Sequence, residues 1–166
     1  MDDRVDISPL PKHVNELATL VIGCGIAVHR ELGPGLLESV YERALQIELG
    51  AAGIQVASQV QVPVVYRGTI IGDHRIDILI ANTIVVELKS VAAISAIHEA
   101  QTLTYLKLGA FPLGLLMNFN VPVLRSGIRR IINPNWRVLP DTKPIPVILQ
   151  QADLHDTRRF VKRPSS

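Results

Sequence analysis

The sequence predicts an α/β domain in which helices flank a mixed β-sheet, and three observations lead to this prediction. Apolar residues recur at helical spacing up to residue 52 and again between residues 92 and 108. The segments between and after these helices alternate apolar and polar residues or are continuously apolar, as strands do. The chain has 166 residues, 48% of them hydrophobic and 19% charged, which suits one domain with a well-buried core.

The first part of the chain predicts two helices and then strands. Glycines follow both predicted helices and are expected to end them. Pro63 restricts its strand to an edge or a bulge, because proline cannot donate a ladder hydrogen bond. The expected elements are, in order, a loose lead-in over residues 1–12, helices over 13–32 and 36–52, and strands over 54–66 and 69–71.

A hairpin over residues 75–90 is the centre of the prediction. Its two apolar strands carry Asp77, Glu87 and Lys89 at positions where burial would favour aliphatic side chains. Charged groups are costly in such a setting unless something pairs with them. Two carboxylates on neighbouring strands, with a lysine beside them, would suit Mg²⁺ or Mn²⁺. The plainer interpretation is a solvated strand face with weak ion pairs.

The register of this hairpin depends on its turn. If residues 81–83 form a three-residue loop, with Asn82 or Thr83 in the left-handed conformation, Ile80 pairs with Ile84. A two-residue loop would instead place Asp77 across from Leu88. The three-residue loop predicts these neighbours: Asp77 opposite Glu87, Arg75 opposite Lys89, the side chains of Asp77, Glu87 and Lys89 on one face, and those of Ile76, Ile78, Val86 and Leu88 on the other.

A third helix and two further strands complete the predicted domain. The helix is expected over residues 92–108, with Gln101 on its core-facing stripe and His98 and Tyr105 on adjacent turns. A glutamine there is alternatively a packing residue. Strands are expected over 113–119 and 128–132, which gives a domain over residues 13–132. A C-terminal extension over 133–166 contains one possible short element at 147–154 and a basic end at 158–163.

Composition limits the classes of protein that the chain can belong to. The 17 Lys and Arg and 15 Asp and Glu give a formal charge of +2, so any surface for nucleic acid must be local. Cys24 is the single cysteine, which excludes an internal disulfide framework. The apolar run 18–28 is about half of the roughly 20 residues that span a bilayer. We therefore expect no membrane partner and a cytoplasmic location, and the low charge content allows a homodimer.

Several motifs occur along the chain in the order in which they occur in the PD-(D/E)XK nuclease superfamily, which the chain therefore resembles. Gly35-Leu36-Leu37-Glu38-Ser39-Val40-Tyr41 is similar to the signature of its GxxExxY proteins, a bacterial and archaeal family related to RecB-type nucleases. One departure is Ile76, which stands before Asp77 where the superfamily name has proline. The remaining motifs are Arg75-Ile76-Asp77, Glu87-Leu88-Lys89, the QxxxY pattern of Gln101 and Tyr105, and Leu113-Gly114-Leu115-Leu116-Met117-Asn118-Phe119.

The resemblance implies a restriction-endonuclease-like core and a role for each matched residue. Asp77 and Glu87 would hold Mg²⁺ or Mn²⁺ with the Leu88 carbonyl, and Glu38 would contribute directly or through water; alone, Glu38 is equally a helix N-terminal charge. Lys89 would orient or help deprotonate the attacking water. The other implied roles are Gln101 positioning Lys89 or the substrate, and Tyr41, Arg75, His98 and Tyr105 contacting nucleic acid or supporting the site.

The resemblance implies a metal-dependent nuclease that acts on DNA. Phosphodiester hydrolysis needs an activated water and a cation that offsets the growing negative charge, and the implied residues could supply both. An alternative is a catalytically silent nucleic-acid-binding or accessory module in DNA repair or defence. A third is a structural protein in which the polar cluster is an ion-pair network.

Overall fold

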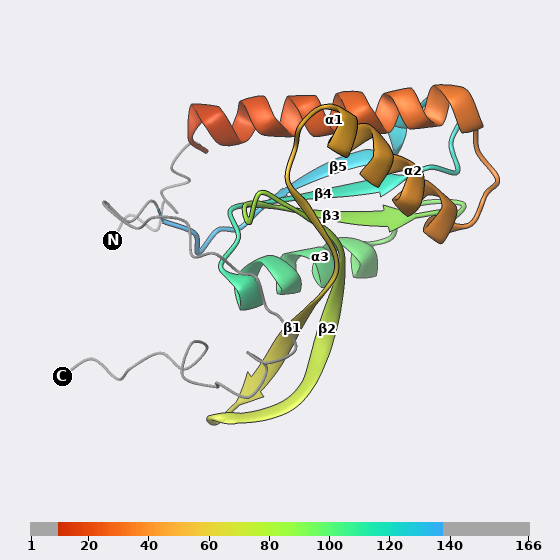
Figure 1. Ribbon diagram of the computed structural model, residues 1–166. Coiled ribbons are helices and arrows are strands. Elements are labelled where there is room, and N and C mark those ends of the chain that lie inside the picture. The colour runs from red at the N-terminus through yellow and green to blue at the C-terminus, as the bar shows by residue number, and fades with distance from the viewer. Residues whose placement is uncertain (1–9, 138–166) are drawn as a thin grey trace, which may run out of the picture.

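The computed structural model describes residues 10–137 and has a five-stranded mixed sheet with helices on both faces (Figure 1). This confirms the predicted α/β class, and the fold is compatible with a restriction-endonuclease-like core. No helix in the described range is long and apolar enough to cross a membrane. The elements are α1 (Lys12–Leu32), α2 (Glu38–Ala51), β1 (Val56–Tyr66), β2 (Thr69–Ile80), β3 (Ile84–Lys89), α3 (Ala96–Gly109), β4 (Leu113–Asn118), the 3₁₀ helix η1 (Leu124–Gly127) and β5 (Ile128–Ile132).

The sheet has the strand order β1-β2-β3-β4-β5. Only β3 and β4 are parallel, and α3 forms the crossover between them, as parallel strands require. Because they are parallel, their carboxyl ends meet at one edge, where Lys89 pairs with Asn118. The start of α2 reaches the same edge, since the Ser90 N–H donates a hydrogen bond to Glu38 Oε1 at 3.1 Å.

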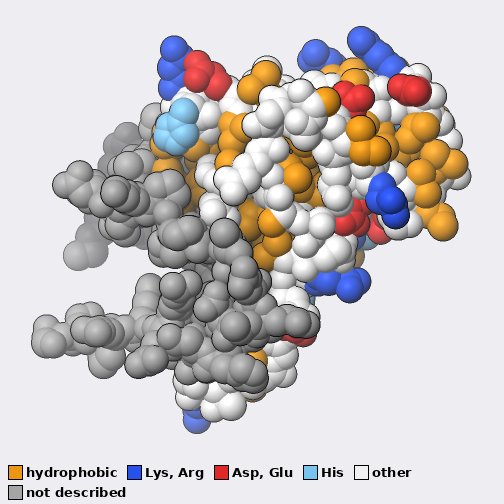
Figure 2. Space-filling model, in the orientation of Figure 1, with side chains coloured by type: hydrophobic (Ala, Val, Ile, Leu, Met, Phe, Trp, Pro, Cys, Tyr) orange, Lys and Arg blue, Asp and Glu red, His pale blue; other side chains and the backbone are white. Residues whose placement is uncertain are grey.

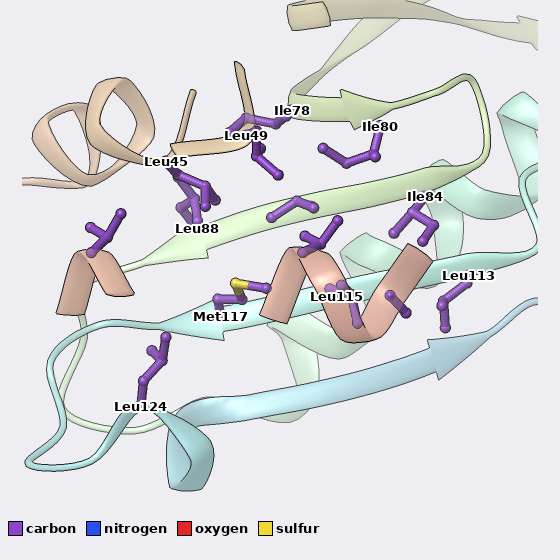
Figure 3. Packing of buried hydrophobic residues seen from close by; sticks show 14 of the residues in the cluster. Leu45, Leu49, Ile78, Ile80, Ile84, Leu88, Leu113, Leu115, Met117 and Leu124 are labelled. Carbon is purple, nitrogen blue, oxygen red and sulfur yellow. The ribbon is translucent and has the colours of Figure 1, made fainter. Parts of the chain in front are cut away.

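Helices α1 and α2 pack on one face of the sheet, and α3 packs on the other (Figure 1). Figure 3 shows the first face, where aliphatic side chains of α2 and of the central strands pack together. The buried residues of α2 are Tyr41, Leu45 and Leu49. On the other face Leu106 and Phe111 cover Leu79 and Val85. Burial on both faces explains why β3 and β4 are largely apolar apart from Glu87, Lys89 and Asn118 at their carboxyl ends.

The turn of the central hairpin has the predicted length. Residues 81–83 connect β2 to β3, and Ile80 pairs with Ile84, which confirms the three-residue loop. The left-handed residues are Ala81 (φ 45°) and Asn82 (φ 52°). Asn82 was one of the two residues expected there, whereas Thr83 is not left-handed. Thr83 instead donates its N–H to the Ile80 carbonyl at 2.8 Å and closes the turn.

Strands β1 and β2 continue past the body of the domain as a bent two-stranded arm (Figure 1). In β1, Gln59 is left-handed at φ 53° and lies between the pairs Ser58↔Ile78 and Val60↔Ile76, and the register shifts again between Val64 and Val65. Ile76 packs in the cluster on the α3 side, while Ile78 packs on the α1 side. The prediction that these two side chains share a face is therefore wrong.

Two further elements differ from the prediction in their extent. Strand β2 runs unbroken through Gly72, where a break was expected, and α3 begins at Ala96 rather than at residue 92. Residues 1–9 and 138–166 lie outside the described part of the chain, so the predictions for the element at 147–154 and for the basic end at 158–163 fall there as well.

Candidate active site

Asp77 and Glu87 meet where β2 and β3 separate. The last ladder pair of these strands is Ile78↔Val86, and the next position in the same register places Asp77 opposite Glu87. There the side chains replace the ladder: the Asp77 N–H donates to Glu87 Oε1 at 3.4 Å, and the Leu88 N–H donates to Asp77 Oδ2 at 2.8 Å. The structure thus brings the two predicted carboxylates together between the strands.

This position makes both carboxyl groups difficult to ionise. Glu87 is 4% exposed, and its pKa is raised to about 8, first by burial and then by the charge of Asp77. The pKa of Asp77 is also raised, mainly by burial, although the Leu88 N–H and the charge of Lys89 act against this. Lys89 lowers the pKa of Glu87 as well. An additional cation would relieve the repulsion between the two carboxylates.

The donor atoms at this position fit a hard divalent cation. Mg²⁺ prefers carboxylate and carbonyl oxygens, keeps several of its waters and needs only one or two protein carboxylates. Within residues 10–137 no group of three or more His, Cys, Asp or Glu side chains is placed to hold one ion. Asp77 and Glu87 thus form a pair of carboxyl groups, and Glu38 does not complete a three-carboxylate group with them.

Glu38 begins α2 and joins it to the end of β3. Its Oε1 accepts the Ser90 N–H, and the Ser90 hydroxyl donates to the Leu36 carbonyl at 2.8 Å. The charge of Glu38 contributes to the raised pKa of both Asp77 and Glu87. Glu38 therefore lies close enough to act on the pair, while its observed hydrogen bond is made to the backbone.

Tyr41 supports the site from inside the core. Its side chain is fully buried and stacks on Phe119 with ring centroids 4.4 Å apart. The hydroxyl donates to the Gly33 carbonyl and accepts the Leu36 N–H at 3.1 Å. This fixes the turn that precedes Glu38. Since Tyr41 has no exposed surface, the alternative that it contacts nucleic acid is wrong, and its role is support.

On α3 only part of the predicted arrangement is present. Tyr105 is half-buried, and its pKa is raised by burial and then by the charges of Glu87 and Asp77, so it lies near the pair. Gln101 is exposed and not on the core face as expected; the buried residues of α3 are Thr102 and Leu106. His98 Nδ1 accepts the Ser95 N–H at 3.2 Å and caps the helix.

Arg75 does not lie opposite Lys89 as predicted. The ladder between β2 and β3 has ended before this point, and Arg75 pairs with Gln61 of β1. It is exposed at the base of the arm. The prediction fails because it continued the hairpin register beyond the place where the strands separate.

Sequence reasoning missed Glu42 and Asn118. Glu42 binds Gln59 Nε2 at 2.8 Å through both carboxylate oxygens and adds to the raised pKa of Asp77. Its position four residues after Glu38, on the same helix face, was an available signal. Asn118 is buried and holds the segment after Lys89, because its amide accepts the Val91 N–H and donates to the Val91 carbonyl.

Comparison with known proteins gives one finding. A family model described as PD-(D/E)XK nuclease superfamily matches residues 15–131. No curated protein and no solved structure matches the chain significantly. The matched range contains every site residue described above.

Proposed function

The chain belongs to the PD-(D/E)XK nuclease superfamily, and on that premise we propose that it hydrolyses phosphodiester bonds of DNA with Mg²⁺ or Mn²⁺. The observation that carries this proposal is the contact of Asp77 and Glu87 between separating strands, with Lys89 close enough to influence both. We place the chain in the GxxExxY branch on the residues from Gly35 to Tyr41.

In this proposal Asp77, Glu87 and the Leu88 carbonyl hold the cation. When bound, the cation would lower the pKa of a water and offset charge on the phosphate. Glu87 would have to give up its proton to hold the cation, so binding would release a proton near neutral pH. Glu38, whose charge acts on both carboxyl groups, would contribute to the site directly or through water.

Lys89 orients the attacking water and stabilises the negative charge that develops on the phosphate. Its ammonium group already acts on both carboxylates. Gln101 lies on the exposed face of α3, where it contacts the substrate rather than Lys89. Tyr105 limits water on the α3 side of the carboxylates.

The test is cleavage of DNA by purified protein with Mg²⁺ or Mn²⁺. We expect Lys89→Ala to lower the rate by about 10²-fold or more, as loss of a charge-stabilising group does. Lys107→Ala, in the exposed last turn of α3, is the matched control and should cleave normally. Normal cleavage by the Lys89 variant would reject the assignment.

A second candidate is a silent module that binds nucleic acid without cleaving it. The observation that favours it is the raised pKa of both carboxyl groups, about 8 for Glu87, which opposes the ionisation that cation binding needs. Calorimetric titration with Mn²⁺ separates the two candidates. The nuclease should bind Mn²⁺ in a manner that Glu87→Gln weakens, whereas absence of binding supports the silent module.

A further inference from the structure

A cavity lies at the end of α1, next to the site but outside it. Its volume is about 380 Å³, within the range of small-ligand sites. His29 Nε2 donates to the Val121 carbonyl at 2.8 Å and so holds the loop after β4 against the helix. The residues that line the cavity are Ile26, His29, Arg30, Gly33, Pro34, Pro122, Val123, Leu124 and Arg125.

Two arginines, both exposed, are among the residues that line this cavity. Arg30 comes from the last turn of α1, and Arg125 comes from η1. In the part of the chain that the structure describes, the ion pairs are Lys12–Glu16 and Arg129–Glu99, so neither arginine of the cavity has a carboxylate partner there. Figure 2 shows Lys and Arg side chains (blue) above the second half of α1. One guanidinium group can donate hydrogen bonds to two phosphate oxygens at once, so a phosphate is the ligand group that two arginines would bind.

The rest of the cavity wall is apolar. Pro34, Pro122 and Val123 contribute rigid or branched hydrocarbon surface, and Val123 is 62% exposed. Unstacked nucleic acid bases pack against aromatic or apolar side chains in protein pockets. Phosphate-binding groups beside an apolar wall therefore fit a nucleotide better than a free inorganic anion.

The cavity and the carboxylate pair share one edge of the sheet. Gly33 and Pro34 line the cavity, and the Gly33 carbonyl accepts the hydroxyl of Tyr41 in the helix that Glu38 begins. On the other side, the loop of Pro122 and Arg125 follows β4, which ends beside Lys89. A nucleic acid strand bound at Asp77 and Glu87 could thus continue over the turn of Gly33 and Pro34.

We propose that this cavity binds a nucleotide, with its phosphate at Arg30 and Arg125 and its base against Pro34 and Pro122. The nucleotide is part of the substrate strand, beside the bond that is cut. The statement that the nucleotide belongs to a substrate strand rests on the proposed function. The cavity and its two arginines do not depend on that proposal.

The experiment measures fluorescence anisotropy of a labelled single-stranded DNA of about 12 nucleotides, a length typical of such sites. The full chain is used in EDTA, so that no metal-dependent cleavage occurs. We expect Arg30→Gln with Arg125→Gln to weaken binding at least about tenfold and to reduce the salt slope by about 0.7, the value for one lost phosphate contact on single-stranded DNA. Arg130→Gln is the matched control, because Arg130 binds Asn15 at the other end of α1.

Each outcome bears on the proposal. Wild-type DNA affinity and salt slope in the double variant, together with no arginine-dependent binding of dAMP, would overturn it, as would an equal loss of DNA binding in Arg130→Gln. Calorimetry with dAMP distinguishes a nucleotide within a DNA strand from a free nucleotide. If dAMP binding depends on both arginines while DNA affinity does not, the cavity is a nucleotide site, but its ligand is a free nucleotide. Normal DNA cleavage, with no effect of the two arginines on the binding of DNA or dAMP, would refute only the proposed nucleotide site. Arginine-dependent DNA binding without any cleavage would refute only the proposed nuclease activity.

Discussion

The buried carboxyl of Glu87 makes the stability of the metal-free protein depend on pH. Its pKa of about 8 lies above the ordinary 4.5, so the native state holds the proton more tightly than the unfolded chain does. The contribution of Glu87 to the free energy of unfolding should therefore be fully present below about pH 4.5 and be lost as pH rises to about 8. At 1.36 kcal/mol for each pKa unit, this difference sets a ceiling of about 5 kcal/mol on the fall.

Urea unfolding in EDTA between pH 5 and 9 measures this fall, and Glu87→Gln isolates its cause. Glutamine keeps an oxygen that can accept the Asp77 N–H but cannot ionise, so the variant should lack this slope and exceed the wild type in stability above pH 8. Asp77→Asn should move the wild-type slope to lower pH, because the charge of Asp77 is the second cause of the shift. Parallel curves for wild type and Glu87→Gln would refute the reasoning, and a loss of stability in Glu87→Gln at all pH values would favour the ion-pair network.

Three further substitutions test how the site is supported, each measured by urea unfolding. Tyr41→Phe keeps the stack on Phe119 but removes both hydroxyl hydrogen bonds, and should cost about 1–3 kcal/mol; a cost below the error would contradict the anchoring role. Gly114→Ala places a Cβ 2.7 Å from the Thr102 side chain and should cost about 1–3 kcal/mol, whereas Gly72→Ala meets nothing within 4 Å and should cost less; equal costs would contradict the close packing. Asn118→Ala removes the buried amide, should cost about 2 kcal/mol or more, and should speed hydrogen exchange after Lys89; unchanged exchange there would refute the clamp.

The hairpin could be predicted because two independent signals agreed in the sequence. The length of the polar turn set the register, and the apolar alternation set which residues face the core. Together they placed Asp77 beside Glu87, as the structure does. The separation of the strands beyond Ile78 was not predicted; near this point Gln59 of β1 is left-handed and donates a hydrogen bond to Glu42 of α2. No local pattern reports such a long-range contact.

The faces of the helices were harder to predict, because apolar residues surround much of each helix. Leu37, which directly precedes α2, and Ile47 within it are apolar, yet their side chains are 74% and 73% exposed. In α3 Gln101 was expected on the core face, but the helix buries Thr102 instead. Thr102 is covered because Gly114 of β4 allows the helix to approach closely. A hydrophobic pattern alone cannot reveal this, since the contact depends on a small residue in another element.

The segment from Gly35 to Tyr41 shows why a short motif can combine structural and chemical roles. Gly35 adopts φ 99°, which only glycine adopts readily, and so turns the chain toward α2. Tyr41 fixes that turn from the core, and Glu38 is thereby held against the backbone at the end of β3. Loss of Tyr41 would leave Glu38 chemically intact but no longer fixed beside the carboxylate pair. If the proposed nuclease activity is correct, Tyr41→Phe should therefore lower cleavage more than its cost in stability explains, while Mn²⁺ binding by Asp77 and Glu87 persists.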